Sequence, residues 1–126
     1  MRPNILLIMT DQHSPHIAGF AGDEIVGTQA LDKLAEQSVR FDAAYCQSPL
    51  CVPSRMEMLT GKWATNCSAY ENSSVIFPEH QTIPSWLARE GYTTALVGKM
   101  HFSGYEQMHG FHYRPYGDLV KCAFPS

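Results

Sequence analysis

The stretch CVPSRMEMLTG, residues 51–61, combines residue types that suit anion chemistry. Pro53 favours the first turn of a helix, where backbone N–H groups and the positive end of the helix dipole attract anions. Cys51 lies just before this helix start, so it is predicted to be a reactive thiol or part of an anion site. Arg55, about one helical turn further, adds a planar fork of donors that suits sulfate, phosphate or carboxylate.

The elements expected around this stretch alternate between strands and helices. They are a strand over residues 4–9, a helix over 29–38 with Thr28 as N-cap, a short strand over 40–45, a helix from Pro53 to the C-cap Gly61, a helix that Thr82 and Pro84 begin and Gly91 ends, and a strand over 92–97. Residues 62–81 are predicted to be a loop because they show no period. This order predicts an α/β fold with a mainly parallel sheet flanked by helices.

Polar side chains follow the first and the last predicted strands. Asp11 and Gln12 come directly after the first, and Lys99 and His101 follow the last. Ligands of open α/β sheets gather beyond the carboxyl ends of the strands, so all four residues are candidates for a site. His13 and His16 are near Asp11 and are weaker candidates for substrate contact. A zinc site would need more ligands than this stretch offers.

Composition limits the classes of function. The chain has 126 residues, 44% of them hydrophobic, which suits one globular domain. Its net charge of −3 and scattered basic residues argue against nucleic acid or an anionic membrane as partner. The apolar run near the N-terminus is too short for a membrane span and lacks the features of a signal peptide, so a cytoplasmic location is expected. The cysteines other than Cys51 are expected to be small buried hydrophobes: Cys46, Cys67 and Cys122.

The motif residues carry a family resemblance. Residues 51–61 resemble the signature C-x-P-S-R-x-x-x-L-T-G of the formylglycine-dependent sulfatases, which belong to the alkaline-phosphatase-like superfamily. GKMH, residues 98–101, resembles the family segment G-K-W-H, with Met100 in place of Trp. The acid after the first strand is similar to the family's first metal ligand, and the pair Asp11 and Gln12 resembles the choline-sulfatase and phosphonate-monoester-hydrolase branches.

The resemblance implies a specific maturation and mechanism. In the family, a formylglycine-generating enzyme converts the motif cysteine to an aldehyde and recognises the proline and arginine, here Pro53 and Arg55. One hydroxyl of the hydrated aldehyde attacks the sulfur of a sulfate ester and releases the alcohol, and the other loses its proton and expels sulfate. A thiol could not perform the second step, because it has no second ionisable oxygen. The expected substrate is a sulfate-ester small molecule or a saccharide.

The resemblance also implies roles for the remaining candidates. Asp11, Gln12 and an oxygen on modified residue 51 would ligate a divalent cation, and oxygen ligands together with family membership favour calcium. Arg55 would hold the hydrate, Lys99 would neutralise the sulfate oxygens, and His101 would hydrogen-bond the hydrate and take its proton.

The length of the chain leaves more than one interpretation of its function open. Family members are several times longer, so residues 1–126 are interpreted as an incomplete N-terminal part of a catalytic domain, completed by a missing C-terminal part or by a second polypeptide. The chain would hydrolyse sulfate esters or, alternatively, phosphonates or phosphodiesters; as a truncated fragment it would at most bind a metal or an anion. A thiol enzyme with Cys51 as nucleophile and His101 as base leaves Pro53 unexplained. Exposed apolar surface on a partial sheet predicts self-association.

Overall fold

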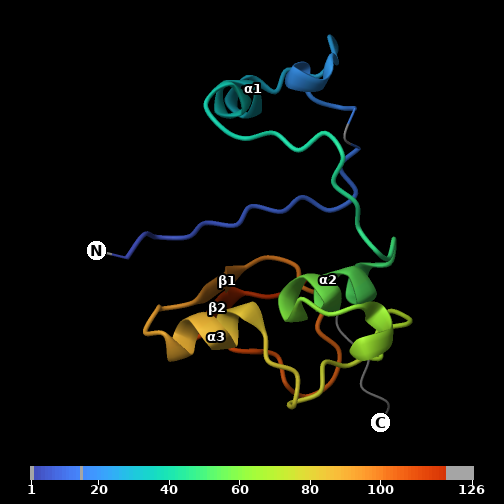
Figure 1. Ribbon diagram of the computed structural model, residues 1–126, viewed down its shortest axis with the longest axis vertical. Coiled ribbons are helices and arrows are strands. Elements are labelled where there is room, and N and C mark those ends of the chain that lie inside the picture. The colour runs from blue at the N-terminus through green and yellow to red at the C-terminus, as the bar shows by residue number, and fades with distance from the viewer. Residues whose placement is uncertain (1, 15, 119–126) are drawn as a thin grey trace. The chain divides into compact units, whose positions relative to one another are not determined.

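The computed structural model describes residues 2–14 and 16–118. The chain forms two compact units, Met1–Ala44 and Tyr45–Ser126 (Figure 1). Among the described residues, no helix has the length and apolar character that a membrane crossing requires.

The first unit contains one short 3₁₀ helix, η1 (Gly19–Ala21), and one α-helix, α1 (Gln29–Glu36). The predicted helix over 29–38 is confirmed, and it ends slightly earlier than expected. Thr28 does occupy the N-cap position, but its hydroxyl makes no capping bond. It accepts a hydrogen bond from the Gly19 amide at 2.7 Å and donates one to Asp32 at 2.9 Å, so it ties the two helices together instead.

The strand predictions in the first unit are wrong. Residues 4–9 form no strand in the part of the chain that the structure describes, and residues 40–45 form a turn flanked by irregular backbone. The side chains of Ile5 to Ile8 are 63–83% exposed. A buried strand requires neighbours that complete its hydrogen-bond ladder and cover both faces, whereas an apolar run supplies only the tendency to be buried.

The second unit holds the rest of the regular structure. It comprises α2 (Cys51–Thr60), η2 (Ala64–Asn66), α3 (Ile83–Arg89), β1 (Ala95–Val97) and β2 (Tyr113–Tyr116). The two strands form a parallel pair with Ala95 opposite Tyr113 and Val97 opposite Tyr116. The strand predicted over 92–97 is therefore confirmed in its last three residues, whereas no strand was predicted where β2 lies. The predicted loop over 62–81 is confirmed except for η2.

Helix α2 begins at Cys51, two residues before the Pro53 start that the sequence suggested. Its N-cap, Leu50, is extended and offers no side-chain acceptor. Gly61 ends the helix in the left-handed region at φ 65°, and its amide donates to the Glu57 carbonyl at 2.8 Å. The predicted glycine C-cap is confirmed.

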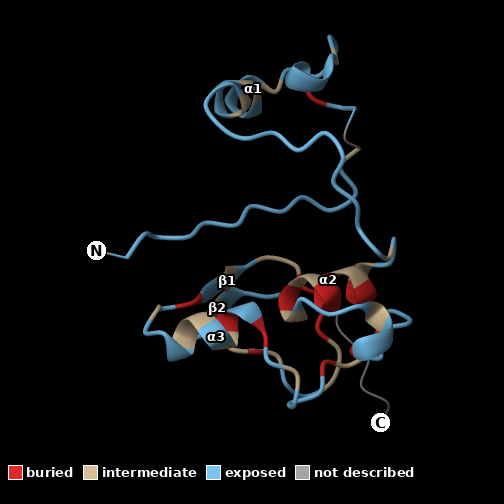
Figure 2. Cartoon of the chain, viewed as in Figure 1, coloured by how far each residue is buried: buried red, intermediate tan, exposed pale blue. Residues whose placement is uncertain are grey.

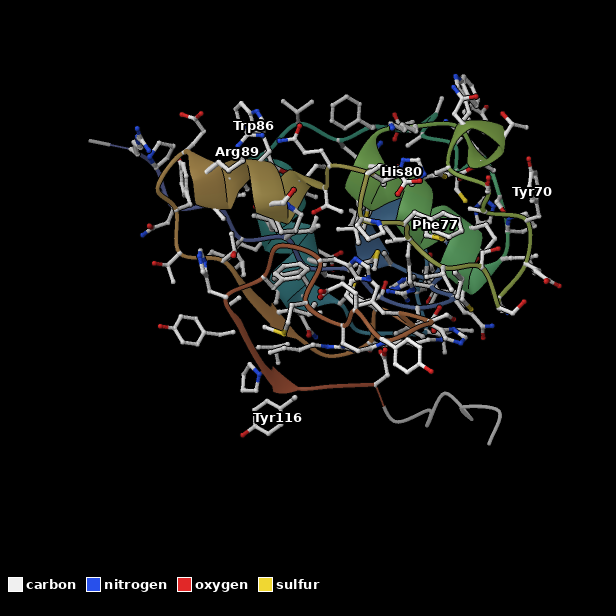
Figure 3. All side chains as sticks on the ribbon, turned by 90° about the horizontal axis from the view of Figure 1, so that it is seen from below. Tyr70, Phe77, His80, Trp86, Arg89 and Tyr116 are labelled. Atoms are coloured by element: carbon white, nitrogen blue, oxygen red, sulfur yellow. The ribbon has the colours of Figure 1, made fainter. Side chains whose placement is uncertain are left out.

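Helix α3 begins with the signals expected from its sequence. Thr82 accepts a hydrogen bond from the Ser85 amide, and Ser85 accepts one from the Thr82 amide, which makes a reciprocal capping box. The large apolar side chains of this helix are only partly covered, because Ile83 and Trp86 are about half exposed. Figure 3 shows Trp86 projecting outward, as do Tyr70 and Tyr116, and Phe77 is also about half exposed.

The core of the second unit lies along one side of α2 (Figure 2). Buried residues of α2 pack against the 67–76 loop and the turn that follows β1; the cluster consists of Val52, Met56, Leu59, Cys67, Ala69, Ile76, Met100 and Phe102. Burial of Cys67 confirms its interpretation as a small hydrophobe, whereas Cys46 is exposed and contradicts it. Cys122 lies outside the described residues.

Candidate active site

Cys51 is the first residue of α2 and is half-buried. Because Leu50 cannot cap the helix, an acceptor comes from the 67–76 loop: Asn72 Oδ1 accepts the Val52 amide hydrogen at 3.1 Å. The side chain of Cys51 therefore lies at the positive end of a ten-residue helix, in the position predicted for it. This end of the helix favours negative charge on a group that residue 51 carries or binds.

Lys99 brings a cation to Cys51 across 48 residues of sequence. Its Nζ lies 3.7 Å from the Cys51 Sγ. The turn that carries Lys99 follows β1 directly: Gly98 has φ 104°, and its amide donates to the Tyr116 carbonyl at 3.2 Å. Two of the residues predicted for the site, Cys51 and Lys99, are thus in contact.

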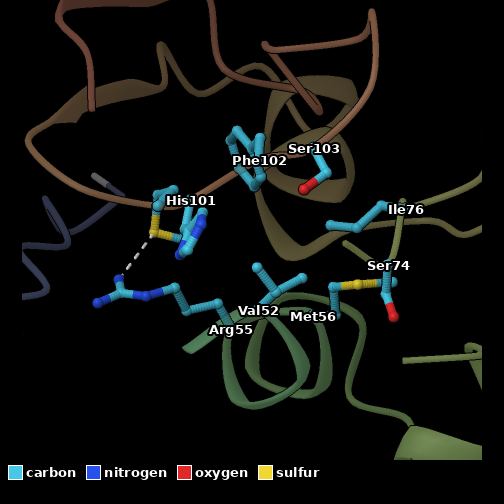
Figure 4. Close-up of a pocket in the computed structure, with 9 residues that line it drawn as sticks. Val52, Arg55, Met56, Ser74, Ile76, His101, Phe102 and Ser103 are labelled. Carbon is cyan, nitrogen blue, oxygen red and sulfur yellow. Dashed lines mark hydrogen bonds between the residues drawn. The ribbon is translucent and has the colours of Figure 1, made fainter. Parts of the chain in front are cut away.

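Arg55 joins α2 to the same turn. Its side chain is buried, and one terminal nitrogen donates to the Lys99 carbonyl at 2.8 Å. The same nitrogen contacts the Met100 Sδ at 3.8 Å (Figure 4). A charge-assisted bond to a backbone carbonyl fixes the turn relative to the helix, so Arg55 helps to hold Lys99 beside Cys51.

His101 is one of the residues that line a small hollow between α2 and the turn, which is too narrow to hold a water molecule. Figure 4 shows its ring above the helix, and the hollow is lined by Val52, Arg55, Met56, Met100, His101 and Phe102, among others. The residue has φ 56°, which is unusual for a side chain other than glycine. Its Nδ1 is buried and has no hydrogen-bond partner among the described residues. A buried ring nitrogen of this kind is suited to hydrogen-bonding a group that enters the site.

Two residues that support the turn were not indicated by the sequence. Asp118 accepts hydrogen bonds from the Met100 and His101 amides, and Arg114 pairs with Asp118 at 2.9 Å. The i,i+4 spacing of Arg114 and Asp118 was visible in the sequence, but no local pattern indicated that they face residues 98–101. Asn72 was missed for the same reason, since its partner Val52 lies 20 residues away.

The proposed metal ligands belong to the other unit. Asp11 and Gln12 lie in an exposed bend, and Gln12 has φ 57°. Their carboxylate and amide oxygens are donors that calcium accepts. No group of three or more His, Cys, Asp or Glu residues that could hold a metal occurs within residues 2–14 and 16–118, so a cation held by this pair needs further donors. The same segment carries His13, whose Nε2 lies 2.7 Å from the Ile17 carbonyl. Metal ligation by Asp11 and Gln12 together with residue 51 stays a prediction.

The sequence matches a known protein family over most of its length. The sulfatase family model matches residues 3–121, which is nearly the whole chain. The chain belongs to the sulfatase family. Choline-sulfatase of Rhizobium meliloti (strain 1021) is 37% identical to this sulfatase chain over 123 residues, 98% of the chain and 24% of the relative. N-acetylglucosamine-6-O-sulfatase of Bacteroides thetaiotaomicron is 37% identical over 100 residues, 79% of the chain and 18% of the relative.

A solved structure agrees with this assignment. It is a complex of a protein with its substrate D-glucosamine-2-N,6-O-disulfate, and it matches this sulfatase chain with a TM-score of 0.83 and 35% identity. The match covers 90% of the chain and 23% of the solved one. The predicted alkaline-phosphatase-like α/β fold is thereby confirmed, although the chain spans about a quarter or less of the length of the relatives it matches.

Proposed function

We propose that this sulfatase chain is the nucleophile-bearing part of a catalytic domain that hydrolyses sulfate esters, with Cys51 converted to formylglycine. One observation carries the proposal: the Lys99 ammonium lies 3.7 Å from the Cys51 Sγ at the N-terminus of α2. A residue-51 side chain that carries a sulfate would there meet both a cation and the positive end of a helix. The sulfatase names of the relatives support the same reaction class.

Residue 51, Lys99 and His101 would each have a separate role in the reaction. The Cys51 sulfur stands where the hydroxyls of a hydrated formylglycine would lie, and these hydroxyls would supply the nucleophile and the group that later expels sulfate. Lys99 would bind the sulfate oxygens. His101 would accept a proton from the hydrate at a ring nitrogen; this role is supported by the buried Nδ1, which has no hydrogen-bond partner among the described residues.

Arg55 was predicted to hold the hydrate, and the structure adds a second contact, with the turn that carries Lys99. Its bond to the Lys99 carbonyl makes it a brace between helix and turn. We propose that the guanidinium positions Lys99 and adds positive charge to the site of the hydrate. Pro53 and Arg55 would also be recognised by the formylglycine-generating enzyme. A divalent cation, calcium by the chemistry of its donors, would be held by Asp11, Gln12 and residue 51 and would stabilise negative charge there.

The substrate class is proposed from the relatives. The relatives include enzymes named for choline sulfate and for a sulfated N-acetylglucosamine, and the solved structure binds a disulfated glucosamine. We propose a sulfate ester of a small alcohol or of a saccharide for this chain.

The test begins with maturation. The chain is produced together with a formylglycine-generating enzyme, and the tryptic peptide of residues 41–55 is weighed. Loss of sulfur and two hydrogens with gain of one oxygen at residue 51 is expected, and Cys51→Ala is the control that must stay unchanged. An unmodified thiol, with a known substrate modified in the same cells, would contradict the formylglycine proposal.

Reaction class is tested with matched aryl esters. The matured chain, with calcium present, is incubated with an aryl sulfate and with a phosphonate monoester of the same phenol. Faster release of the phenol from the sulfate is expected, and it should vanish in Cys51→Ala. Preference for the phosphonate would favour the phosphonate-hydrolase alternative, and activity that persists in the unmatured thiol form would favour a thiol enzyme. Hydrolysis of neither ester would favour the alternative of a truncated fragment that at most binds a metal or an anion.

A further inference from the structure

Asp118 holds the turn that carries Lys99 and His101. One carboxylate oxygen accepts the Met100 amide hydrogen at 2.6 Å, and the other accepts the His101 amide hydrogen at 2.7 Å. The Asp118 side chain is only 8% exposed, so these bonds are formed away from water. A buried carboxylate that binds two successive amides fixes the orientation of both peptide planes.

Arg114 supports Asp118 from the opposite side. One terminal nitrogen donates to Asp118 Oδ2 at 2.9 Å, and the other donates to the carbonyl and the side-chain oxygen of Gln107. The guanidinium carbon also lies 5.2 Å from the centre of the Phe102 ring. The Arg114 side chain is 9% exposed, so the ion pair with Asp118 is buried on both sides.

The turn needs such support because its backbone is strained. His101 adopts φ 56°, a strained conformation that a residue with a side chain keeps only where its surroundings impose it. Its amide is one of the two that Asp118 binds.

We propose that Asp118 is a positioning residue for the sulfate site: its carboxylate sets residues 98–101 so that Lys99 reaches residue 51 and His101 faces the hollow. This inference rests on the function proposed above. Among the described residues, the hydrogen bonds of Asp118 go to the Met100 and His101 amides and to Arg114, so it would act through the turn. Its contribution should therefore appear in anion affinity as well as in stability.

The experiment must separate positioning from the ordinary stability of a buried ion pair. Replacing Asp118 alone would leave the Arg114 charge buried without its partner, which by itself is strongly destabilising. The comparison is therefore made within an Arg114→Met background, where Asp118 keeps its two amide partners. The variants are Arg114→Met, Arg114→Met with Asp118→Asn, and Arg114→Met with Asp118→Glu, which restores a carboxylate.

Two readouts are taken on the full chain well below the melting temperature of every variant. Inorganic sulfate is titrated by NMR to obtain its Kd, and hydrogen exchange is measured at the Met100 and His101 amides. Asp118→Asn is expected to weaken sulfate binding about tenfold and to accelerate exchange at both amides, because one acceptor oxygen becomes a donor. Asp118→Glu should recover most of both effects.

The outcomes separate the two proposals. If the Arg114→Met chain and its Asp118→Asn derivative bind sulfate equally, Asp118 serves stability only and the positioning role is wrong, while the proposed function stands. If even the wild-type chain binds no sulfate and Cys51 stays a thiol beside the maturation enzyme, the proposed function fails and the positioning role fails with it. In that case, faster exchange in Asp118→Asn would still identify the carboxylate as a structural clamp.

Discussion

Arg55 is buried and bonded to the Lys99 carbonyl, so its replacement should weaken the fold as well as the site. Arg55→Lys keeps the charge but loses the planar fork and shortens the reach. We expect the free energy of unfolding to fall by about 1.5–3 kcal/mol, the usual contribution of a hydrogen bond to a charged group. Urea denaturation of both proteins measures the difference.

The matched control for Arg55 is Arg89→Lys. Arg89 lies in the last turn of α3 and is exposed (Figure 3), so the same exchange there should change stability by no more than about 0.5 kcal/mol. Equal effects at Arg55 and Arg89 would show that the bond to the Lys99 carbonyl contributes nothing to the fold.

His109 should make the second unit sensitive to mild acid. Burial lowers the pKa of His109; Glu106 opposes this by raising it, and Arg114 lowers it further. Because the folded state binds the proton less readily than the unfolded state, the stability contributed by neutral His109 is complete above about pH 6.5 and is lost as the pH falls below that value. Urea midpoints should therefore decline between about pH 7 and pH 5.

The variant His109→Asn tests the origin of that decline. Asparagine tolerates the positive φ of 41° at this position, and it does not titrate. The decline should flatten in this variant. Glu106 titrates at lower pH, because hydrogen bonds from the Met108 and His109 amides lower its pKa, so its loss of stability comes later as the pH falls. An unchanged pH profile in His109→Asn would exclude His109 as the cause.

The candidate site illustrates which residues the sequence could indicate. Cys51, Pro53 and Arg55 were recognisable because their chemistry lies within a single helical turn. Lys99 and His101 were found because they follow a strand and match a family motif, although only the structure shows that Lys99 touches Cys51. Asp118 carried no such signal: an acid after a short strand is usually a turn residue, and its role depends on two amides far from it in the sequence.

At the scale of elements, the start of α2 depends on a side chain from another segment. Leu50 cannot cap the helix, and Asn72 Oδ1 accepts the Val52 amide hydrogen instead. Asn72→Ala should reduce the free energy of unfolding by about 1 kcal/mol, the typical effect of removing a cap. It should also move the first turn of α2 and thereby weaken sulfate binding. Urea denaturation and the sulfate titration measure the two effects.

Asn66→Ala provides the comparison for Asn72. Asn66 is exposed at the end of η2, so its replacement should alter stability by less than about 0.5 kcal/mol and leave sulfate binding unchanged. If Asn72→Ala is as mild as Asn66→Ala, the N-terminus of α2 forms without a cap from the 67–76 loop.

Helices were more predictable here than strands, for a physical reason: of the predicted strands only 92–97 is confirmed, in its last three residues. The ends of α2 and α3 are defined by local signals such as the Gly61 C-cap and the Thr82 capping box. Strand β2 contains Pro115 and exposed tyrosines, so neither composition nor alternation indicated it. It exists because its residues pair with β1, and a proline that cannot donate a hydrogen bond is compatible with an edge strand.

At the scale of the whole molecule, the predicted parallel α/β architecture appears only in part. The described residues contain one parallel pair, β1 and β2, whereas the apolar run at residues 4–9 forms no strand. The pattern of that run predicted a buried strand, and its exposed side chains contradict this prediction. The pattern could not indicate whether strands to pair with it would be present, since pairing depends on residues distant in the sequence.

This exposed run should govern the behaviour of the isolated chain. Ile5, Leu6, Leu7 and Ile8 are 63–83% exposed, and consecutive apolar side chains of this kind promote association. We expect sedimentation velocity to show self-association that increases with concentration in the micromolar range.

The double variant Leu6→Ser with Ile8→Ser should be markedly more monomeric. Ile25→Ser removes an isolated side chain that is 93% exposed and should leave association unchanged. A wild-type chain that stays monodisperse and melts cooperatively as a monomer would mean that residues 4–9 do not drive association, and that the chain folds stably despite this exposed run.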